Sequence, residues 1–133
     1  MWTAKEINVW NERCSSNWEE HYSKVHENLG FKPGLASTCI FRHPTRNIVV
    51  VIHGDDFTAL GWDKDLDWYR HEIQGCMQTK VKGRIGPGDN DLKTMRVLNR
   101  IVEWTPKGIT YEADQRHVEI ICQSLGLKEL NLK

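Results

Sequence analysis

The sequence lacks several features that define common classes of protein. No apolar run approaches the ~18 residues that span a membrane, and the N-terminus has no signal-peptide core. The four cysteines are widely spaced without a Cys-x-x-Cys pair, which argues against a zinc site and against a disulfide framework. The formal net charge is zero, so bulk charge does not indicate nucleic-acid binding. These absences predict an intracellular protein that does not bind a membrane.

The composition is that of a folded domain. A chain of 133 residues is long enough to build one hydrophobic core, and its 39% hydrophobic and 27% charged residues are typical of globular proteins. Basic residues are concentrated between residues 78 and 107, where seven lysines and arginines accompany three acidic residues. A solvated surface is the ordinary explanation of such an excess, and a surface that faces phosphate is the alternative.

The strongest strand signal is the run of five β-branched residues at 48–52. An unbroken run of this kind is typical of a strand that is covered on both faces. A second apolar run at 57–60 follows a polar segment made of His53, Gly54, Asp55 and Asp56. Gly54 supplies the positive φ that a type II′ turn requires at its first central residue. The sequence therefore predicts a tight hairpin with two adjacent carboxylates at its end.

Helical and strand patterns are segregated along the chain. Helices are predicted at about 16–29, at 63–74 with Asp63 as cap and Gly75 as stop, and from Asp114 onward. In the first helix one apolar stripe, predicted to pack in the core, consists of Trp18, Tyr22, Val25 and Leu29. Strands at 38–42, 47–53 and 57–60 follow one another and predict an antiparallel meander.

Later strand signals complete the pattern. A short strand is predicted at 79–81, and strands at 95–104 and 108–112 flank a hairpin turn at 105–107. The fold class is therefore α+β, an antiparallel meander with packed helices. We assign residues 1–15 to an irregular N-terminal segment, 16–127 to one domain and 128–133 to a C-terminal tail.

The Asp55–Asp56 pair is the strongest candidate for chemistry. Adjacent carboxylates repel one another, so a rigid strand end is a costly place for them unless a cation binds there. Carboxylate oxygens suit Mg²⁺ or Mn²⁺, the ions used in two-metal phosphoryl transfer. The ordinary alternative is an Asx-type turn without a ligand. His53 is a candidate ligand or general acid, although a histidine at a strand end is more often packed. Stacking on nucleic-acid bases is a possible role for Trp62, Trp68 and Trp104, and ordinary packing is the alternative for each.

The hairpin and its surroundings resemble a known family. Two predicted strands are joined here by His53-Gly54-Asp55-Asp56-Phe57, and this arrangement resembles the x-x-Asp-Asp hairpin of reverse transcriptases. The flanking residues resemble the copia-type retrotransposon branch of that family. Upstream, Leu29-Gly30-Phe31 and residues 36–41 lie at the family's spacing. Downstream, the segments that resemble the family are Lys80-Val81-Lys82-Gly83 after the palm helix, 97–109 at the primer-gripping hairpin, and 115–127 in the helix leading to the thumb. The resemblance covers about residues 16–127.

The resemblance implies an RNA-directed DNA polymerase, a nucleotidyltransferase that adds nucleotides to a primer. Asp55 and Asp56 would be two of three palm aspartates that bind Mg²⁺ or Mn²⁺. Lys80 or Lys82 would lie near the departing phosphates. Contacts to nucleic acid or the primer end would come from His53, Gly54, Leu98, Asn99 and Arg100. The implied partners are a primer–template and the missing fingers segment of a longer polyprotein, and the implied fold is the C-terminal part of a palm with the start of the thumb connection.

The sequence departs from the family's pattern in two ways. His53 and Gly54 stand where the family usually has an aromatic and a branched residue. The family's third aspartate comes from an upstream strand, yet no aspartate precedes Asp55, and Glu6 and Glu12 are in the wrong context to replace it. We therefore expect a palm fragment that is inactive alone. The alternatives are a non-catalytic palm-derived module that binds nucleic acid or protein, and a metal-dependent phosphatase or nuclease that uses the same carboxylates.

Overall fold

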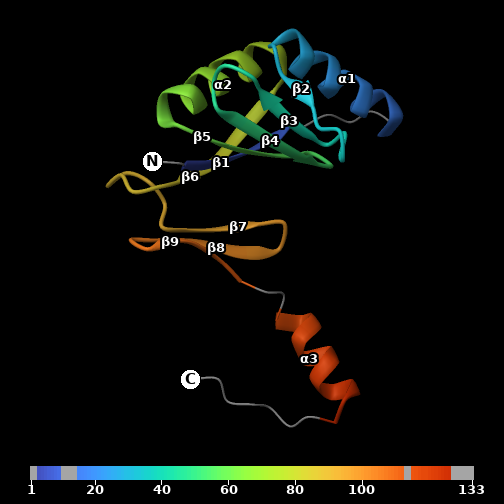
Figure 1. The fold of residues 1–133 in the computed structure, drawn as a ribbon, viewed down its shortest axis with the longest axis vertical. Helices are drawn as coiled ribbons and strands as arrows, with labels where there is room; N and C mark the ends of the chain where they lie inside the picture. Colours follow the sequence, from blue (N-terminus) through green and yellow to red (C-terminus); the bar gives the residue numbers. More distant parts are fainter. Residues whose placement is uncertain (1–2, 10–14, 113–114, 127–133) are drawn as a thin grey trace. The chain divides into compact units, whose positions relative to one another are not determined.

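The described chain forms two compact units. The computed structural model describes residues 3–9, 15–112 and 115–126, shown in Figure 1. Unit 1 comprises residues 1–92 and unit 2 comprises residues 93–133. The sequence, in contrast, predicts a single domain over 16–127. The division arises because the strands after residue 92 pair only with one another and form their own sheet. The tail predicted at 128–133 lies outside the described residues.

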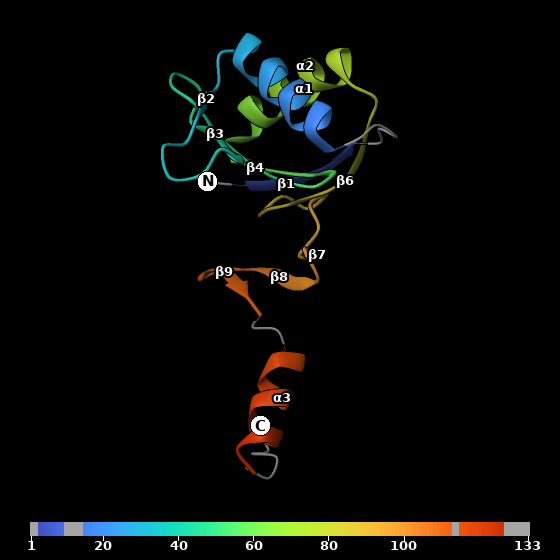
Figure 2. The ribbon, with the colours of Figure 1, turned by 90° about the vertical axis from the view of Figure 1, so that its right-hand side faces the viewer.

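Unit 1 contains a six-stranded antiparallel sheet and two helices. Its elements in chain order are β1 (Thr3–Val9), α1 (Ser15–Asn28), β2 (Lys32–Pro33), β3 (Ile40–His43), β4 (Ile48–His53), β5 (Asp56–Gly61), α2 (Asp63–Cys76) and β6 (Thr79–Ile85). The strand order is β2-β3-β4-β5-β1-β6. Strands β3, β4 and β5 form the predicted antiparallel meander. Both helices lie against the same face of the sheet (Figure 2).

Strand β1 is the main correction to the predicted elements of unit 1. The segment 1–15 was expected to be irregular, but residues 3–9 form a strand between β5 and β6, antiparallel to both. Its sequence, TAKEINV, has no clear period of its own. Its partners lie far along the chain, so tertiary pairing rather than a local pattern determines this strand.

The core of unit 1 lies between the sheet and its two helices. Alternate residues of the strands meet the apolar stripes of the helices, and the fully buried side chains include Phe41, Ile48, Val50, Phe57, Leu66, Tyr69 and Ile73. Neither helix of unit 1 lies on the other face of the sheet, and there Val51 of β4 is 40% exposed. The prediction that both faces of β4 are covered is therefore wrong.

The ends of α2 differ from those that the sequence predicts. The helix begins at Asp63, but its cap residue is Trp62, which makes no side-chain capping hydrogen bond. Gly75 lies inside the helix, which continues to Cys76. In contrast, Gly30 follows α1 with a φ of 90°, as expected for a glycine that ends a helix.

Unit 2 contains a three-stranded antiparallel sheet and a helix. Its elements are β7 (Thr94–Val97), β8 (Arg100–Thr105), β9 (Gly108–Tyr111) and α3 (Gln115–Ser124). The predicted hairpin at 105–107 is confirmed. The strand predicted at 95–104 is instead two strands, because Leu98 and Asn99 form a turn with φ values of 48° and 63°. Leucine rarely adopts positive φ, which hides this turn from a sequence-based prediction.

The described chain is therefore an α+β protein with antiparallel sheets and three helices. None of the helices within residues 3–9, 15–112 and 115–126 is long and apolar enough to cross a membrane. The cap predicted at Asp114 lies outside the described residues, and α3 begins directly after it at Gln115.

Candidate functional site

The Asp55–Asp56 turn joins β4 to β5 at the end of a regular antiparallel ladder. The last backbone pair of this ladder is His53 with Asp56, so Gly54 and Asp55 form a two-residue loop. Gly54 has a φ of 58°, as predicted for the first central residue of a type II′ turn. Asp55 is exposed and Asp56 is half-buried. The turn therefore presents two adjacent carboxylates on a short, defined loop.

The backbone of Gly54 provides a direct test of this turn. Neither Gly54 nor Gly75 has an atom within 4 Å of an added Cβ, so alanine meets open space at both positions. We expect Gly54→Ala to lower the free energy of unfolding by about 1–2 kcal/mol, because a positive φ strains an L-residue. We expect Gly75→Ala, inside α2, to raise it by up to about 1 kcal/mol. Urea denaturation measures both changes, and equal effects would contradict the turn geometry.

Helix α1 holds the turn from the helix-covered side of the sheet. The indole Nε1–H of Trp18 donates a hydrogen bond to the carbonyl oxygen of Gly54, with 3.0 Å between nitrogen and oxygen. The Trp18 ring stacks on Phe57, the residue after Asp56, with ring centroids 6.1 Å apart. The sequence assigns Trp18 to the core stripe of the helix. Its hydrogen bond to the turn is a second role, and no local pattern reveals it because Gly54 lies 36 residues away in the sequence.

Lys82 of β6 contacts the turn directly. Its ammonium nitrogen lies 3.1 Å from Oδ1 of Asp56, although β1 lies between β5 and β6 in the sheet. The register of β6 against β1 shifts at this point, since Val81 pairs with Ile7 and Gly83 pairs with Glu6. Lys82 is therefore the extra residue of a β-bulge, a feature that redirects side chains and often lies beside active sites.

The remaining residues singled out from the sequence lie in different places. Lys80 is exposed on β6, in register with Asn8 of β1, and its side chain has no described contact with Asp56. His53 is exposed at the end of β4 rather than packed in the core. The three predicted primer contacts belong to unit 2, where Leu98, Asn99 and Arg100 form the turn between β7 and β8 and the start of β8. The structure thus brings Lys82, but not Lys80, to the aspartates.

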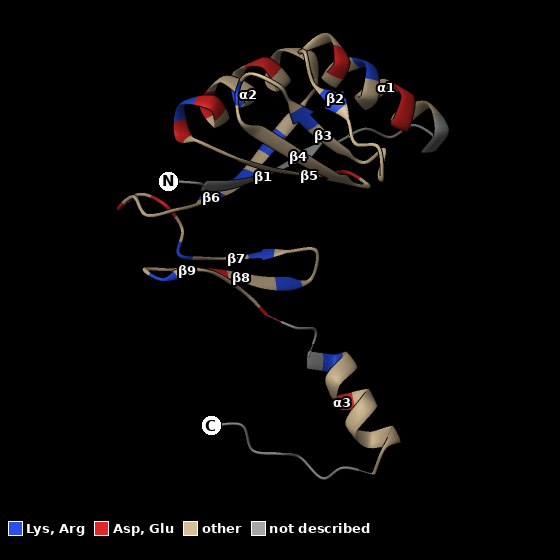
Figure 3. Cartoon of the chain, in the orientation of Figure 1, with Lys and Arg blue, Asp and Glu red and all other residues tan. Residues whose placement is uncertain are grey.

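Two basic residues of β6, Lys82 and Arg84, are paired with acidic residues within unit 1. Figure 3 shows lysine and arginine positions along β6 and acidic positions at the start of α2. Arg84 forms ion pairs with Asp63, at 3.4 Å, and with Asp67. Together with the Lys82–Asp56 pair, these contacts account for part of the basic excess noted in the sequence. This part is neutralised by the protein itself rather than only by solvent.

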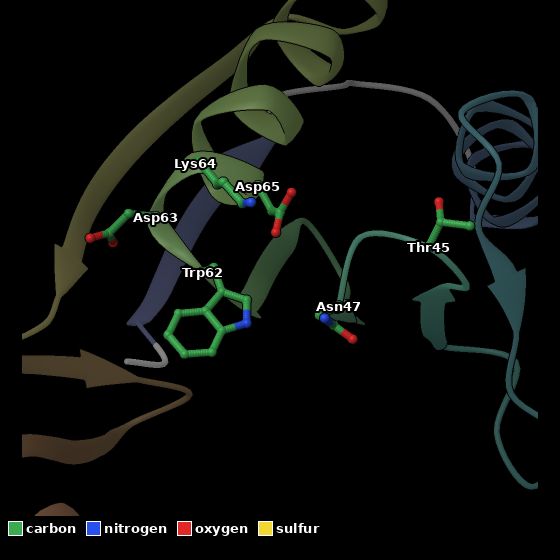
Figure 4. Close-up of a pocket in the computed structure, with 6 residues that line it drawn as sticks. All are labelled: Thr45, Asn47, Trp62, Asp63, Lys64 and Asp65. Carbon is green, nitrogen blue, oxygen red and sulfur yellow. The ribbon is translucent and has the colours of Figure 1, made fainter.

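A depression in unit 1 lies away from Asp55 and Asp56. It has a volume of about 540 Å³ and is lined by Thr45, Asn47, Trp62, Asp63, Lys64 and Asp65. Figure 4 shows Trp62, Asp63, Lys64 and Asp65 at the start of α2, across from Thr45 and Asn47. Its most buried carboxylate, Asp65, forms an ion pair with Arg46 at 3.6 Å. None of the lining residues belongs to the turn, so we place the candidate chemistry at Asp55 and Asp56.

The donor set at the turn suits a weakly held hard cation. Among the described residues, no cluster of three or more histidine, cysteine, aspartate or glutamate side chains is arranged to hold a metal ion. Asp55 and Asp56 supply two carboxylates, the oxygen ligands that Mg²⁺ accepts while keeping several of its waters. The two residues therefore fit one such ion better than the pair of ions that phosphoryl transfer requires.

Comparisons with models of known protein families, with curated proteins and with solved structures found no match. The assignment of function therefore depends on the residues and contacts described above.

Proposed function

We propose that this chain is a palm portion of a copia-type retrotransposon reverse transcriptase, an RNA-directed DNA polymerase. The observation that supports this best is the Asp55–Asp56 pair on a type II′ turn between two antiparallel strands. The order of the surrounding elements agrees with the resemblance, since α1 and β3 precede the hairpin and α2 and β6 follow it. The β7–β8 turn at Leu98 and Asn99 lies where the resemblance expects the hairpin that grips the primer.

In this proposal each group at the turn has a defined role. Asp55 and Asp56 would hold Mg²⁺ or Mn²⁺, and the bound ion would stabilise the negative charge that develops during phosphoryl transfer. The primer 3′-hydroxyl would lose its proton to water and bond to the α-phosphate of an incoming nucleotide, and the bond from that phosphate to pyrophosphate would break. Trp18 fixes the backbone that carries the carboxylates. The resemblance places Lys80 or Lys82 near the departing phosphates, and the observed Lys82–Asp56 contact favours Lys82.

On the same grounds, we expect these 133 residues not to polymerise nucleotides alone. No aspartate precedes Asp55 in the sequence. Strand β1, which borders β5, has Asn8 in register with Asp56 and contains no aspartate. With two carboxylates from one strand end, metal binding is weak and the two-ion geometry is incomplete.

Titration with Mg²⁺ or Mn²⁺, followed by NMR, tests the carboxylate site. We expect a dissociation constant in the millimolar range, with shifts centred on the turn that vanish in Asp55→Asn/Asp56→Asn. The matched control is Glu19→Gln/Glu20→Gln, which removes two adjacent exposed carboxylates from α1 and should leave the titration unchanged. Equal titrations of the wild type and the aspartate variant would contradict the proposal.

The second candidate function is a non-catalytic palm-derived module that binds nucleic acid or a protein. It is favoured by the missing third carboxylate, because a module without catalysis does not need one. This candidate predicts that Asp55→Asn/Asp56→Asn changes neither metal binding nor partner binding. The same NMR titration therefore separates the two candidates.

A further inference from the structure

The ion pair between Lys82 and Asp56 has consequences for the regulation of the carboxylate site. Two adjacent carboxylates repel each other, and an opposite charge nearby relieves that repulsion. The ammonium group of Lys82 supplies such a charge at 3.1 Å from Asp56 Oδ1. Asp55, Asp56 and Lys82 together carry one net negative charge, whereas the two aspartates without the lysine carry two. The metal-free turn is thus stabilised by a cation that belongs to the chain.

The bulge in β6 explains how Lys82 reaches this position. Neighbouring strands lie about 4.8 Å apart, so β5 and β6 are separated by about 10 Å across β1. A lysine side chain is long enough to reach across one strand, provided that its Cα–Cβ bond points to the same face of the sheet as the side chain of Asp56. As the extra residue opposite the Glu6–Ile7 step, Lys82 is placed by the bulge rather than by regular alternation.

The pair lies at the surface with both side chains partly exposed. The Lys82 side chain is 36% exposed and the Asp56 side chain 28% exposed, so both are partly removed from solvent. Partly buried charges are screened less by salt than fully exposed ones. Asp55, by contrast, is exposed at the tip of the turn. An incoming cation therefore meets Asp55 first and competes with the ammonium group for Oδ1 of Asp56.

We propose that Lys82 is a built-in counter-ion that a divalent cation displaces from Asp56. The inference depends on the proposed metal-binding function and adds a regulatory element to it. A cation that binds Oδ1 of Asp56 competes with the ammonium group of Lys82 for that oxygen. Metal affinity is consequently set low by the chain's own lysine as well as by the small number of carboxylates.

A pair of lysine variants tests the displacement. We expect Lys82→Met to bind Mn²⁺ about three- to tenfold more tightly than the wild type, because the competing cation is gone. Lys80→Met removes the same charge two residues away on the same strand, and we expect a change of less than about twofold. Both affinities are measured by NMR titration of the amide signals of the turn.

A second measurement uses the wild-type protein and needs no variant. Saturating Mg²⁺ should shift the side-chain signals of Lys82 as the ammonium leaves Asp56, while those of Lys80 should stay in place. This readout keeps the proposal testable if Lys82→Met fails to fold.

The outcomes separate the displacement from the metal site itself. If the wild type binds metal and Lys82→Met binds it equally or more weakly, the counter-ion proposal is overturned and the metal site stands. If both lysine variants gain affinity equally, the effect is one of general charge, and the specific role of Lys82 is overturned. If no protein in the series binds metal, the proposed function and this inference both fail.

Discussion

Replacement of Phe57 by alanine is expected to lower the free energy of unfolding of unit 1 by about 3–5 kcal/mol. Phe57 is fully buried in β5. Its ring lies 5.5–6.2 Å from the rings of Trp18, Tyr22 and His26, measured between centroids. Alanine would remove the ring from the centre of this cluster and leave a cavity that the surrounding strands and helices cannot fill completely.

Leu60 provides the control on the same strand. Its side chain points to the face without helices and is 38% exposed. We expect Leu60→Ala to cost less than about 1 kcal/mol, because the leucine is already partly exposed and its truncation removes less buried apolar surface. Urea unfolding followed by tryptophan fluorescence measures both variants. A small effect at Phe57, or equal effects at the two positions, would contradict the assignment of the core to the helix-covered face.

Acidification is expected to destabilise unit 1 through His26. This side chain is fully buried, and its Nδ1–H donates to the carbonyl oxygen of Tyr22 at 2.7 Å while Nε2 accepts from the hydroxyl of Tyr69 at 2.8 Å. Burial lowers the pKa of His26 below its ordinary value of 6.5, and the bond to Tyr22 only partly opposes this shift. The neutral ring therefore links α1 to α2 in the folded state.

The sign of the effect follows from where the proton binds. Well above pH 6.5 the ring is neutral in both states, and His26 contributes no pH dependence to stability. As the pH falls from 6.5 through the lowered folded-state pKa, the unfolded chain binds the proton first, so stability declines by at most about 1.4 kcal/mol per pH unit. Below the folded-state pKa, both states are protonated and the contribution of His26 no longer changes.

Urea unfolding at a series of pH values measures the decline. The His26→Gln variant should lose this part of the pH dependence, whereas His71→Gln, at an exposed position on α2, should retain it. Identical profiles for the wild type and His26→Gln would show that the buried imidazole does not control the acid response.

The hairpin at the centre of the site was predictable because its signals are local. Five β-branched residues, a glycine with positive φ and a second apolar run together specify two strands and the turn between them. The sequence therefore indicated Asp55 and Asp56 as neighbours at a strand end. Local signals failed where a residue adopts an unfavourable conformation, as Leu98 does, or where a strand depends on distant partners, as β1 does.

The surroundings of Asp55 and Asp56 were less predictable, because they depend on contacts between residues that are far apart in the sequence. The resemblance indicated Lys80 and Lys82 without distinguishing them, since both belong to one alternating strand segment. Only the bulge against β1 places Lys82 at Asp56, and β1 itself was not predicted. Trp18 likewise looked like an ordinary core residue, because its bond to Gly54 joins a helix to a turn far along the chain.

The position of β1 also bears on how unit 1 folds. A strand from the start of the chain lies between β5 and β6, whose residues follow much later. The meander β3-β4-β5 has close partners in sequence and can assemble early, whereas β1 must close long loops before it gains any pairing. The sheet therefore combines fast local contacts with slow distant ones. We therefore expect the bulge that sets Lys82 against Asp56 to form after the meander.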